Sequence, residues 1–571
     1  MGQKAKNEVD FRCAYYKKDN TWTVLWGDEF NNGIGTESFK ECLLSLINSC
    51  KNEQIKIFVN DVRTIGEVFK GKLFGEHRRG EHQKKVECIG KTLTTTKNGN
   101  ITRLFNLNVF INDNMKHYFE EHECPALMMR EYLEHINTNP FAIKYSLGYM
   151  SKRKFYAPIR ETLTEDIINS NRNIMTGDMY NHLKTGNRSG FLVNSKEDAD
   201  YIRSLGFDPI GITIDNKIIT NGIDEYDLNS AYISTMISDW TFPVGQVYEL
   251  DSKNEHIIEK FDKLTDSAKW FKIYIPENVS VDVRIAMLCG DTRNEGYGIE
   301  YYDYKALTEF CGMKKEDFHE LLKEDGVCLY WCYAGRLHEA VRKRVAEYYD
   351  NKKNPEIKGT IYGDLAKQEN ELIYGKSLQD LDFDFSEIKV VMGKLSDGIN
   401  YMLPHMALHC TAAVRYRLMQ ACFENMETVT YYDTDSIHGT DLEEYIEIDN
   451  SVNDFKNAIA GFKGCTAGRW KTEQKNSTEI IFAPKQRICL QDGEWIVRVC
   501  GIGRLHVEDH IRKLKDLGYS DKMVLNYFYM NGFDEVIVPV YVFDPESGYN
   551  RVEMDYGTFK KTYGKDELDG A

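Results

Sequence analysis

The stretch TVTYYDTDSIHGT, residues 428–440, places two aspartates on either side of one threonine, directly after a run of β-branched and aromatic residues. Such a run predicts a strand that ends in a turn. Asp433 and Asp435 are two positions apart, so on an extended backbone their carboxylates point to the same face. Two carboxylates that close repel each other unless a cation lies between them. The stretch therefore fits either a polar hairpin turn or a site for a hard cation such as Mg²⁺ or Mn²⁺.

A third aspartate lies in GIDEYDLNSAYISTM, residues 222–236, which predicts a short strand, a turn and the start of a helix. Asp227 ends the strand, and Asn229 or Ser230 could cap the helix. Backbone N–H groups at a helix start can bind a polyphosphate. Asp227 and the two aspartates of the first stretch would together supply three carboxylates from two strand ends, as in two-metal phosphoryl transfer. Taken alone, Asp227 is equally well explained as an ordinary turn aspartate.

The segment KQENELIYG, residues 367–375, predicts a helix with one chemically suggestive face. Lys367, Asn370 or Glu371, and Tyr374 recur at helical spacing and so share that face. A lysine and a tyrosine placed this way can hold a triphosphate and stack on a base. For this helix by itself, a solvated face with a tyrosine in the core is the better interpretation.

Together, the segments DLNSAY, KQENELIYG and YYDTDS resemble the three polymerase motifs of family B DNA polymerases, and they occur in the same order. The resemblance is to the protein-primed polymerases of bacteriophages and linear plasmids, and it covers roughly residues 222–500. It implies an α/β multidomain chain with the right-hand arrangement of palm, fingers and thumb. It also implies an N-terminal RNase H-like domain of the exonuclease type.

The resemblance implies a role for each residue of these motifs. Asp227, Asp433 and Asp435 would be the catalytic residues and, with the backbone carbonyl of Leu228, would hold two Mg²⁺ or Mn²⁺ ions. Tyr232 would lie under the sugar and leave no room for a 2′-hydroxyl. The residues expected to bind the incoming nucleotide are Asn229, Ser230, Ala231, Tyr232, Lys352, Lys353, Lys367, Glu371 and Tyr374.

Further positions would contact DNA. The stretch FAPKQRICL, residues 482–490, falls where the family has a Lys-x-Tyr motif that touches the primer end. Lys485 matches the lysine, and Arg487 replaces the tyrosine. Lys485 by itself could also be an ordinary surface lysine. Thr434 and Ser436 of the first stretch are expected at the DNA as well.

The chain departs from the family pattern at several positions. Ile233 stands where the motif around Tyr232 usually ends in proline, and Glu371 stands where the family usually has asparagine. The exonuclease carboxylates are incomplete: the candidate positions are Asp10, Arg12 in place of glutamate, Asn60, Thr64 in place of aspartate, and Asp166 without its tyrosine. An arginine among metal ligands opposes cation binding. We therefore expect a degenerate exonuclease-like domain that keeps a structural or DNA-guiding role.

The resemblance also predicts how the chain is divided. The predicted parts are a degenerate 3′–5′ exonuclease-like domain (1–175), a linker with the first part of the palm (176–249), an insertion of the kind that clasps a terminal priming protein (250–335), the fingers (336–378), the second part of the palm with a short insertion (379–475), and the palm end with the thumb (476–571). Local pattern predicts helices over 39–48, 337–353, 364–378 and 405–426, and strands over 21–26 and 55–60.

Composition narrows the function classes. The net charge of −17 argues against a protein coated with basic patches, although residues 336–376 hold nine Lys/Arg against seven Asp/Glu. No apolar run reaches the roughly 18 residues of a membrane span, and the N-terminus lacks a signal sequence. The 14 cysteines form no C-x-x-C pair, and HYFEEHEC (117–124) and HMALHC (405–410) lack zinc spacing. We expect reduced thiols in the cytoplasm of a bacterial or mobile-element host.

Three functions remain open from the sequence. The first is a DNA-directed DNA polymerase that extends a 3′-hydroxyl, or a protein hydroxyl primer, with dNTPs on a primer-template. The second is a specialised template-independent nucleotidyltransferase on the same fold, suggested by Glu371 and the incomplete exonuclease. The third is an inactive scaffold that binds nucleic acid, and the complete set of Asp227, Asp433 and Asp435 argues against it.

Overall fold

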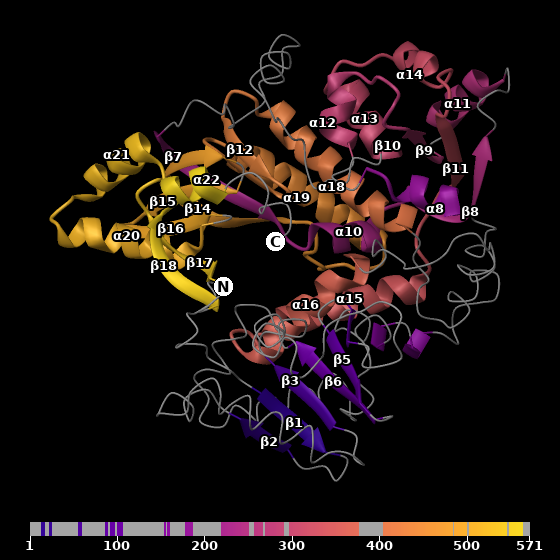
Figure 1. Ribbon diagram of the computed structural model, residues 1–571. Coiled ribbons are helices and arrows are strands. Elements are labelled where there is room, and N and C mark those ends of the chain that lie inside the picture. The colour runs from indigo at the N-terminus through magenta and orange to yellow at the C-terminus, as the bar shows by residue number, and fades with distance from the viewer. Residues whose placement is uncertain are drawn as a thin grey trace. The chain divides into compact units, whose positions relative to one another are not determined.

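The computed structural model describes residues 13–17, 22–25, 55–59, 86–89, 92–97, 100–106, 154–155, 157–159, 177–186, 219–250, 256–266, 269–290, 296–375, 404–483, 485–499, 502–544 and 548–563 (Figure 1). The chain divides into two units. The first consists of Met1–Ser151, Lys352–Gln368 and Ile537–Ala571, and the second of Lys152–Asn351 and Glu369–Val536. The second unit therefore contains Asp227 and the acidic stretch around residue 433.

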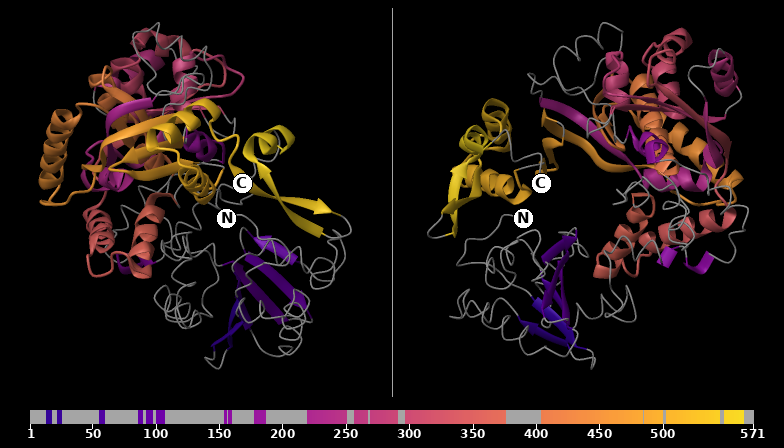
Figure 2. Two further views of the ribbon diagram at one scale, coloured as in Figure 1. Left: turned by 90° about the vertical axis from the view of Figure 1, so that its left-hand side faces the viewer. Right: turned by 45° about the vertical axis from the view of Figure 1, so that its right-hand side comes forward.

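The second unit is built around an antiparallel sheet with the strand order β12-β13-β7-β14-β15-β16. Its strands are β7 (Ile219–Leu228), β12 (Val429–Asp433), β13 (Ser436–Gly439), β14 (Trp470–Ala483), β15 (Gln486–Gln491) and β16 (Glu494–Val499). The long strands β7 and β14 run side by side (Figure 2). Segments from three distant parts of the sequence thus meet in one sheet.

Three helices pack with this sheet: α10 (Ala231–Ser238), α18 (Pro404–Glu424) and α19 (Glu443–Ile459). Helix α18 confirms the helix predicted over 405–426, and it contacts both α10 and the sheet. It is apolar around most of its circumference, as expected for a helix surrounded by protein. Leu418 and Met419 of α18 share a core with Tyr226, Leu228 and Ile437 of the sheet.

A second antiparallel sheet, with the strand order β10-β9-β11-β8, spans most of the predicted insertion. Its strands are β8 (Phe242–Leu250), β9 (Trp270–Ile275), β10 (Tyr297–Glu300) and β11 (Cys328–Gly335); its helices are α11 (Ile257–Asp266), α12 (Val283–Cys289), α13 (Tyr301–Glu309) and α14 (Lys315–Leu321). Phe261 of α11 packs on Phe271 of β9 and on Phe318 of α14. Helix α8 (Gly177–Lys184) contributes Tyr180 and Leu183 to a further core with this sheet.

The remaining elements bear out several local predictions. Helices α15 (Glu339–Lys353) and α16 (Ile361–Gly375) match the helices predicted over 337–353 and 364–378. The second unit also contains α20 (Arg504–Asp516) and α21 (Asp521–Asn531).

The first unit contains a sheet with the strand order β2-β1-β3-β6-β5-β4. Its strands are β1 (Cys13–Lys17), β2 (Trp22–Leu25), β3 (Ile55–Val59), β4 (Val86–Ile89), β5 (Thr92–Lys97) and β6 (Asn100–Asn106). The same unit contains the strand pair β17 (Ile537–Asp544) and β18 (Gly548–Asp555), which is followed by α22 (Tyr556–Tyr563). Strands β2 and β3 confirm the predicted strands, whereas residues 39–48 lie outside the described residues.

Two general properties can be read from the described part of the chain. The cysteines whose surroundings are described are free thiols, and most of them are buried. Among the described helices, none has both the length and the apolar character that crossing a bilayer requires.

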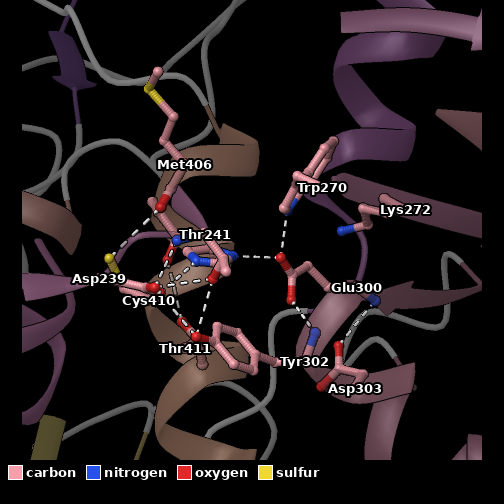
Figure 3. A network of polar contacts seen from close by, with 12 residues as sticks. Asp239, Thr241, Trp270, Lys272, Glu300, Tyr302, Asp303, Met406, Cys410 and Thr411 are labelled. Atoms are coloured by element: carbon pink, nitrogen blue, oxygen red, sulfur yellow. Dashed lines mark hydrogen bonds and ion pairs between the residues drawn. The ribbon is translucent and has the colours of Figure 1, made fainter. Parts of the chain in front are cut away.

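A buried network of charged side chains joins α18 to the second sheet (Figure 3). His409 is fully buried, with Nε2 at 2.8 Å from Asp239 and Nδ1 at 2.5 Å from Glu300. Burial alone would lower the pKa of His409, but the two carboxylates raise it to about 10. The imidazole is therefore doubly protonated at neutral pH and donates to both carboxylates.

The other buried ions of this network also have hydrogen-bond partners. Arg415 of α18 donates to both carboxylate oxygens of Asp303 at 2.7 and 2.9 Å. Lys272 is fully buried and donates to the backbone carbonyls of Leu183 and Thr185. Each buried ion thus has a polar partner, as burial demands. The HMALHC segment lies within this packing, and HYFEEHEC lies outside the described residues.

Replacing His409 by leucine should destabilise the fold by about 3–5 kcal/mol, because Asp239 and Glu300 lose the cation between them. The effect should depend on pH. The pKa of His409 is about 10 in the folded chain and near 6.5 in the unfolded chain. The stabilisation is therefore complete below about pH 6.5 and is lost as the pH rises towards 10. Urea unfolding of the wild type and H409L at pH 6, 8 and 10 measures this loss.

His256 provides the matched control, because its side chain on the surface is 73% exposed. His256→Leu should change stability by less than about 0.5 kcal/mol at each pH. A difference between the wild type and H409L that stays constant from pH 6 to pH 10 would contradict the charged state assigned to His409.

Candidate active site

The pairing of β7 with β13 brings Asp227 next to the acidic hairpin. Asp433 pairs with Ser436 across the hairpin, and Ser436 pairs with Asp227 on β7. Residues that face each other across strands lie on the same face of a sheet. The Cα atoms of Asp227 and Asp433 are therefore two strand spacings apart, about 10 Å. The backbone N–H of Leu228 also donates to the carbonyl of Asp435 at 2.8 Å, which fixes the hairpin turn against the end of β7.

The turn between the two aspartates has an uncommon backbone. Thr434 has a φ of 55°, and the N–H of Asp435 donates to the carbonyl of Asp433 at 2.6 Å. This three-residue turn is costly for a β-branched residue. Strand β12 ends at Asp433. This agrees with the predicted strand that ends in a turn, and the chain leaves the extended conformation at Thr434. Such strain is often found at functional sites.

Asp433 has hydroxyl groups and one lysine around its carboxylate. Thr434 Oγ1 donates to it at 2.8 Å, and Tyr431 Oη lies 3.4 Å away. Ser436 Oγ donates to the backbone carbonyl of Asp433 at 3.1 Å. Lys485 Nζ lies 3.9 Å from the carboxylate, and its side chain is 56% exposed. The sequence placed all of these residues at the site except Tyr431, whose hydroxyl also accepts from the N–H of Lys485.

The turn after β7 is held by hydrogen bonds within the protein. The N–H of Asn229 donates to the carbonyl of Arg469 at 2.8 Å, and its side-chain amide donates to Tyr349 at 2.5 Å and to the carbonyl of Thr466 at 3.4 Å. Both donor groups of Asn229 therefore have partners within the protein, and its contact with a nucleotide stays a prediction. Ser230 occupies the cap position of α10 with a φ of 50°, but its side chain makes no capping hydrogen bond.

Two tyrosines predicted at a nucleotide site do meet in the structure. The rings of Tyr232 on α10 and Tyr374 on α16 are 4.4 Å apart at their centroids. Burial raises the pKa of both phenols, so they remain neutral hydroxyls. Asn370, one turn before Tyr374, is buried and donates to Ser230 Oγ at 3.3 Å. Glu371 is exposed, so Asn370 rather than Glu371 shares the inner face with Tyr374.

The remaining predicted nucleotide residues divide into two groups. The side chains of Leu228 and Ala231 are buried, so only their backbone groups can face a ligand. Lys352, Lys353 and Lys367 lie on α15 and α16 within the first unit, and their contact with a nucleotide stays a prediction. The exonuclease positions Asp10, Arg12, Asn60, Thr64 and Asp166 lie outside the described residues.

Arg487 does not reach the surface where DNA was expected. Its guanidinium is buried and donates to Glu225 at 2.6 Å and to Glu479 at 2.8 Å, with His438 at 2.9 Å. This buried cluster pairs the charge of Arg487 within the protein, and a contact between Arg487 and DNA stays a prediction. Burial alone would raise the pKa of Glu479, but His438 and Arg487 lower it to about 2.

Sequence reasoning missed the other members of this cluster. Glu225 is two residues before Asp227 on β7, so both side chains lie on the same face of the sheet. His438 pairs with Glu225 on β13, two residues after Ser436. The signal was therefore present as period-two spacing of polar residues in two strands. The sequence did not reveal which distant arginine would complete the cluster.

The donor set at the hairpin suits a hard divalent cation. Carboxylates and backbone carbonyls are the ligands that Mg²⁺ prefers, and Asp227, Asp433 and Asp435 lie at the neighbouring ends of β7 and β12 and in the turn that follows β12. Among the described residues, no group of three His, Cys, Asp or Glu side chains is already close enough to hold a metal ion. The chemistry of these residues fits Mg²⁺ or Mn²⁺. Their side chains would have to move closer together to coordinate such an ion.

The sheets, the acidic hairpin and the helices around them form a mixed α/β fold. No family model and no curated protein matches the sequence. The chain is similar to phi29 DNA polymerase in an orthorhombic crystal form, with a TM-score of 0.53 and 13% identity over 95% of this chain and 98% of that chain. A structure of phi29 DNA polymerase complexed with single-stranded DNA gives a TM-score of 0.51 and 12% identity, with the same coverage. The chain thus shares the fold of a protein-primed family B polymerase over most of its length.

Substitution of Arg487 and of Lys485 should differ strongly in its effect on the stability of the fold. Arg487→Leu should destabilise the fold by about 3–5 kcal/mol, because Glu225 and Glu479 lose their buried partner. Lys485→Ala should change stability by less than about 0.5 kcal/mol, because its side chain is largely in solvent. Urea unfolding midpoints measure both effects. Equal stability of R487L and the wild type would contradict the buried pairing described for Arg487.

Proposed function

We propose that the chain is a DNA-directed DNA polymerase that extends a 3′-hydroxyl, or a protein hydroxyl primer, with dNTPs. The observation that carries this proposal is the register of β7 and β13, which sets Asp227 beside the Asp433–Asp435 turn. The fold shared with phi29 DNA polymerase supports it. Three carboxylates at one end of a sheet match the needs of two-metal phosphoryl transfer.

In this proposal, Asp227 and Asp433 are the main metal ligands, with Asp435 and the carbonyl of Leu228 completing the set. Two Mg²⁺ or Mn²⁺ ions held there would activate the attacking hydroxyl and neutralise the leaving pyrophosphate. Thr434 and Tyr431 orient the carboxylate of Asp433 through their hydroxyls.

The tyrosine pair serves as the nucleotide pocket in this proposal. Tyr232 supports the sugar, and Tyr374 packs beside the nascent base pair. Asn370 links α16 to the turn that carries Ser230, so the pocket and the acidic site are joined by a hydrogen bond. A carboxylate near an incoming triphosphate would repel it, but the side chain of Glu371 is exposed and can turn away. Lys367, Lys352 and Lys353 would bind the phosphates.

The proposal extends to the other parts of the chain. Lys485, beside Asp433, would contact the primer end. Phi29 DNA polymerase has been seen in complex with single-stranded DNA, and we infer that this chain also binds DNA, which as a polymerase it would take as a primer-template. The segment 250–335 would receive a terminal priming protein, and the N-terminal domain 1–175 would have lost its proofreading activity.

Asp227→Asn and Asp433→Asn should each lower the rate of nucleotide incorporation by at least about 10³-fold, because each removes a negative charge from the metal site. Primer extension on a defined template with Mg²⁺ measures this rate. Asp441→Asn is the matched control, since Asp441 is an exposed aspartate with a φ of 53°, a conformation that asparagine tolerates. D441N should retain the wild-type rate.

The same assay separates the alternatives when each dNTP is supplied alone and all four are supplied together. Products that follow the template support the polymerase. Template-free homopolymers support the nucleotidyltransferase. No incorporation with either Mg²⁺ or Mn²⁺ leaves only the inactive scaffold, and unchanged incorporation by D227N and D433N would refute the site itself.

Tyr232→Ala should raise the incorporation of ribonucleotides relative to deoxyribonucleotides by at least about 10-fold, because the ring no longer blocks a 2′-hydroxyl. Single-turnover incorporation of rNTPs and dNTPs gives the ratio. Tyr232→Phe keeps the ring and should keep the wild-type ratio. If Y232F and Y232A lose discrimination equally, the ring is not the steric barrier.

A further inference from the structure

Helix α19 carries large apolar side chains on the side that faces away from the protein. Ile448, Val452, Phe455 and Ile459 are between 43% and 66% exposed. They follow one another at intervals of four, three and four residues, which places them in one line along the helix. This is the spacing of the apolar seam between paired helices. We call these four residues the α19 seam.

The opposite face of α19, which packs against the protein, consists largely of asparagines. Asn450 exchanges two hydrogen bonds with the backbone of Trp470, at 3.2 and 2.7 Å. Asn453 and Asn457 both donate to the carbonyl of Ala467, at 2.9 and 3.1 Å. A surface helix ordinarily buries its apolar face and exposes its polar face. Helix α19 does the reverse, so the protein's own core does not account for the seam.

The charges around the seam are separated along the helix. Glu443, Glu444 and Glu447 are exposed at its beginning, whereas Lys456 and Lys463 are exposed at or just beyond its end. The acidic beginning disfavours contact with an anionic membrane surface. It favours instead an occupant whose charges run in the opposite direction, and an antiparallel copy of the same helix has that property.

We propose that the α19 seam is the interface of a homodimer in which α19 packs antiparallel against α19 of a second copy. A two-fold axis placed between Val452 and Phe455 sets Val452 against Phe455 of the second copy. The same register sets Ile448 against Ile459 of the second copy. All four seam residues are then covered by one symmetric contact, as a closed dimer requires.

The charged residues fit the same antiparallel arrangement. Lys463 lies in the turn after α19 ends at Ile459, so this arrangement brings it to the same end of the helix pair as Glu444 of the second copy. The antiparallel arrangement also places the two helix dipoles in opposite directions, which is electrostatically favourable. One helix pair is a small interface, so a dissociation constant on the order of 10 µM is expected.

Light scattering of the full chain across a concentration series around 10 µM tests the proposal. The wild type should move from the monomer mass to twice that mass. Phe455→Asp should remain monomeric throughout. The control is Met530→Asp on α21, where Met530 is 74% exposed and lies outside the seam. M530D should dimerise like the wild type. A wild type that stays monomeric, or an F455D variant that still dimerises, overturns the proposal.

Charge reversal tests the occupant and its orientation. Glu444→Lys and Lys463→Glu should each weaken the dimer by about 10-fold, since like charges then meet at both ends. The double variant E444K/K463E should return to within about threefold of the wild type. Failure of the double variant to recover overturns the antiparallel second copy, and the seam would then belong to a helix of another protein. Circular dichroism confirms that each variant is folded.

Discussion

The register between β7 and β13 is the constraint on which the candidate active site depends. Asp227 and Asp433 belong to segments far apart in the sequence, and only the pairing of Ser436 with both strands aligns them. A slip of one residue would turn Asp227 to the opposite face of the sheet. The hydrogen bond from Leu228 to the carbonyl of Asp435 opposes such a slip, because it closes the turn against β7 in one register only.

The buried cluster next to the acidic hairpin specifies the same register by a different means. Glu225 and His438 form the second pair beyond Asp227 and Ser436 along the two strands, and Arg487 from β15 reaches across β14 to Glu225. Shifting β7 by one residue would leave Arg487 and Glu479 buried without full compensation, at a cost of several kcal/mol. Buried ion pairs add little net stability on average, but they penalise wrong alignments strongly.

Much of this fold was predictable, because strand and helix patterns are local. The strand that ends near Asp227, the hairpin, and helices α15, α16 and α18 follow from spacing and turn residues alone. The sequence does not reveal contacts between groups that are distant along the chain. Neither the burial of Arg487 against Glu225 nor the hydrogen bond from Asn229 to Tyr349 follows from a local pattern. The positive φ of Thr434 within the predicted turn could not be foreseen, because β-branched residues rarely adopt one.

The buried carboxylates of the second unit differ from Asp433 in the cation that neutralises them, and this difference bears on function. Asp239, Glu300 and Asp303 are buried against His409 or Arg415, and Glu225 and Glu479 are buried against Arg487. The protein thus supplies an internal cation wherever it buries an acid, as desolvation requires. Asp433 differs, because its cation is Lys485, 3.9 Å away on a largely exposed side chain. A lysine in that position can move aside at little cost, since its charge is already solvated. An acidic turn that is strained at Thr434, fixed in register and only loosely neutralised has the properties that reversible binding of divalent cations demands.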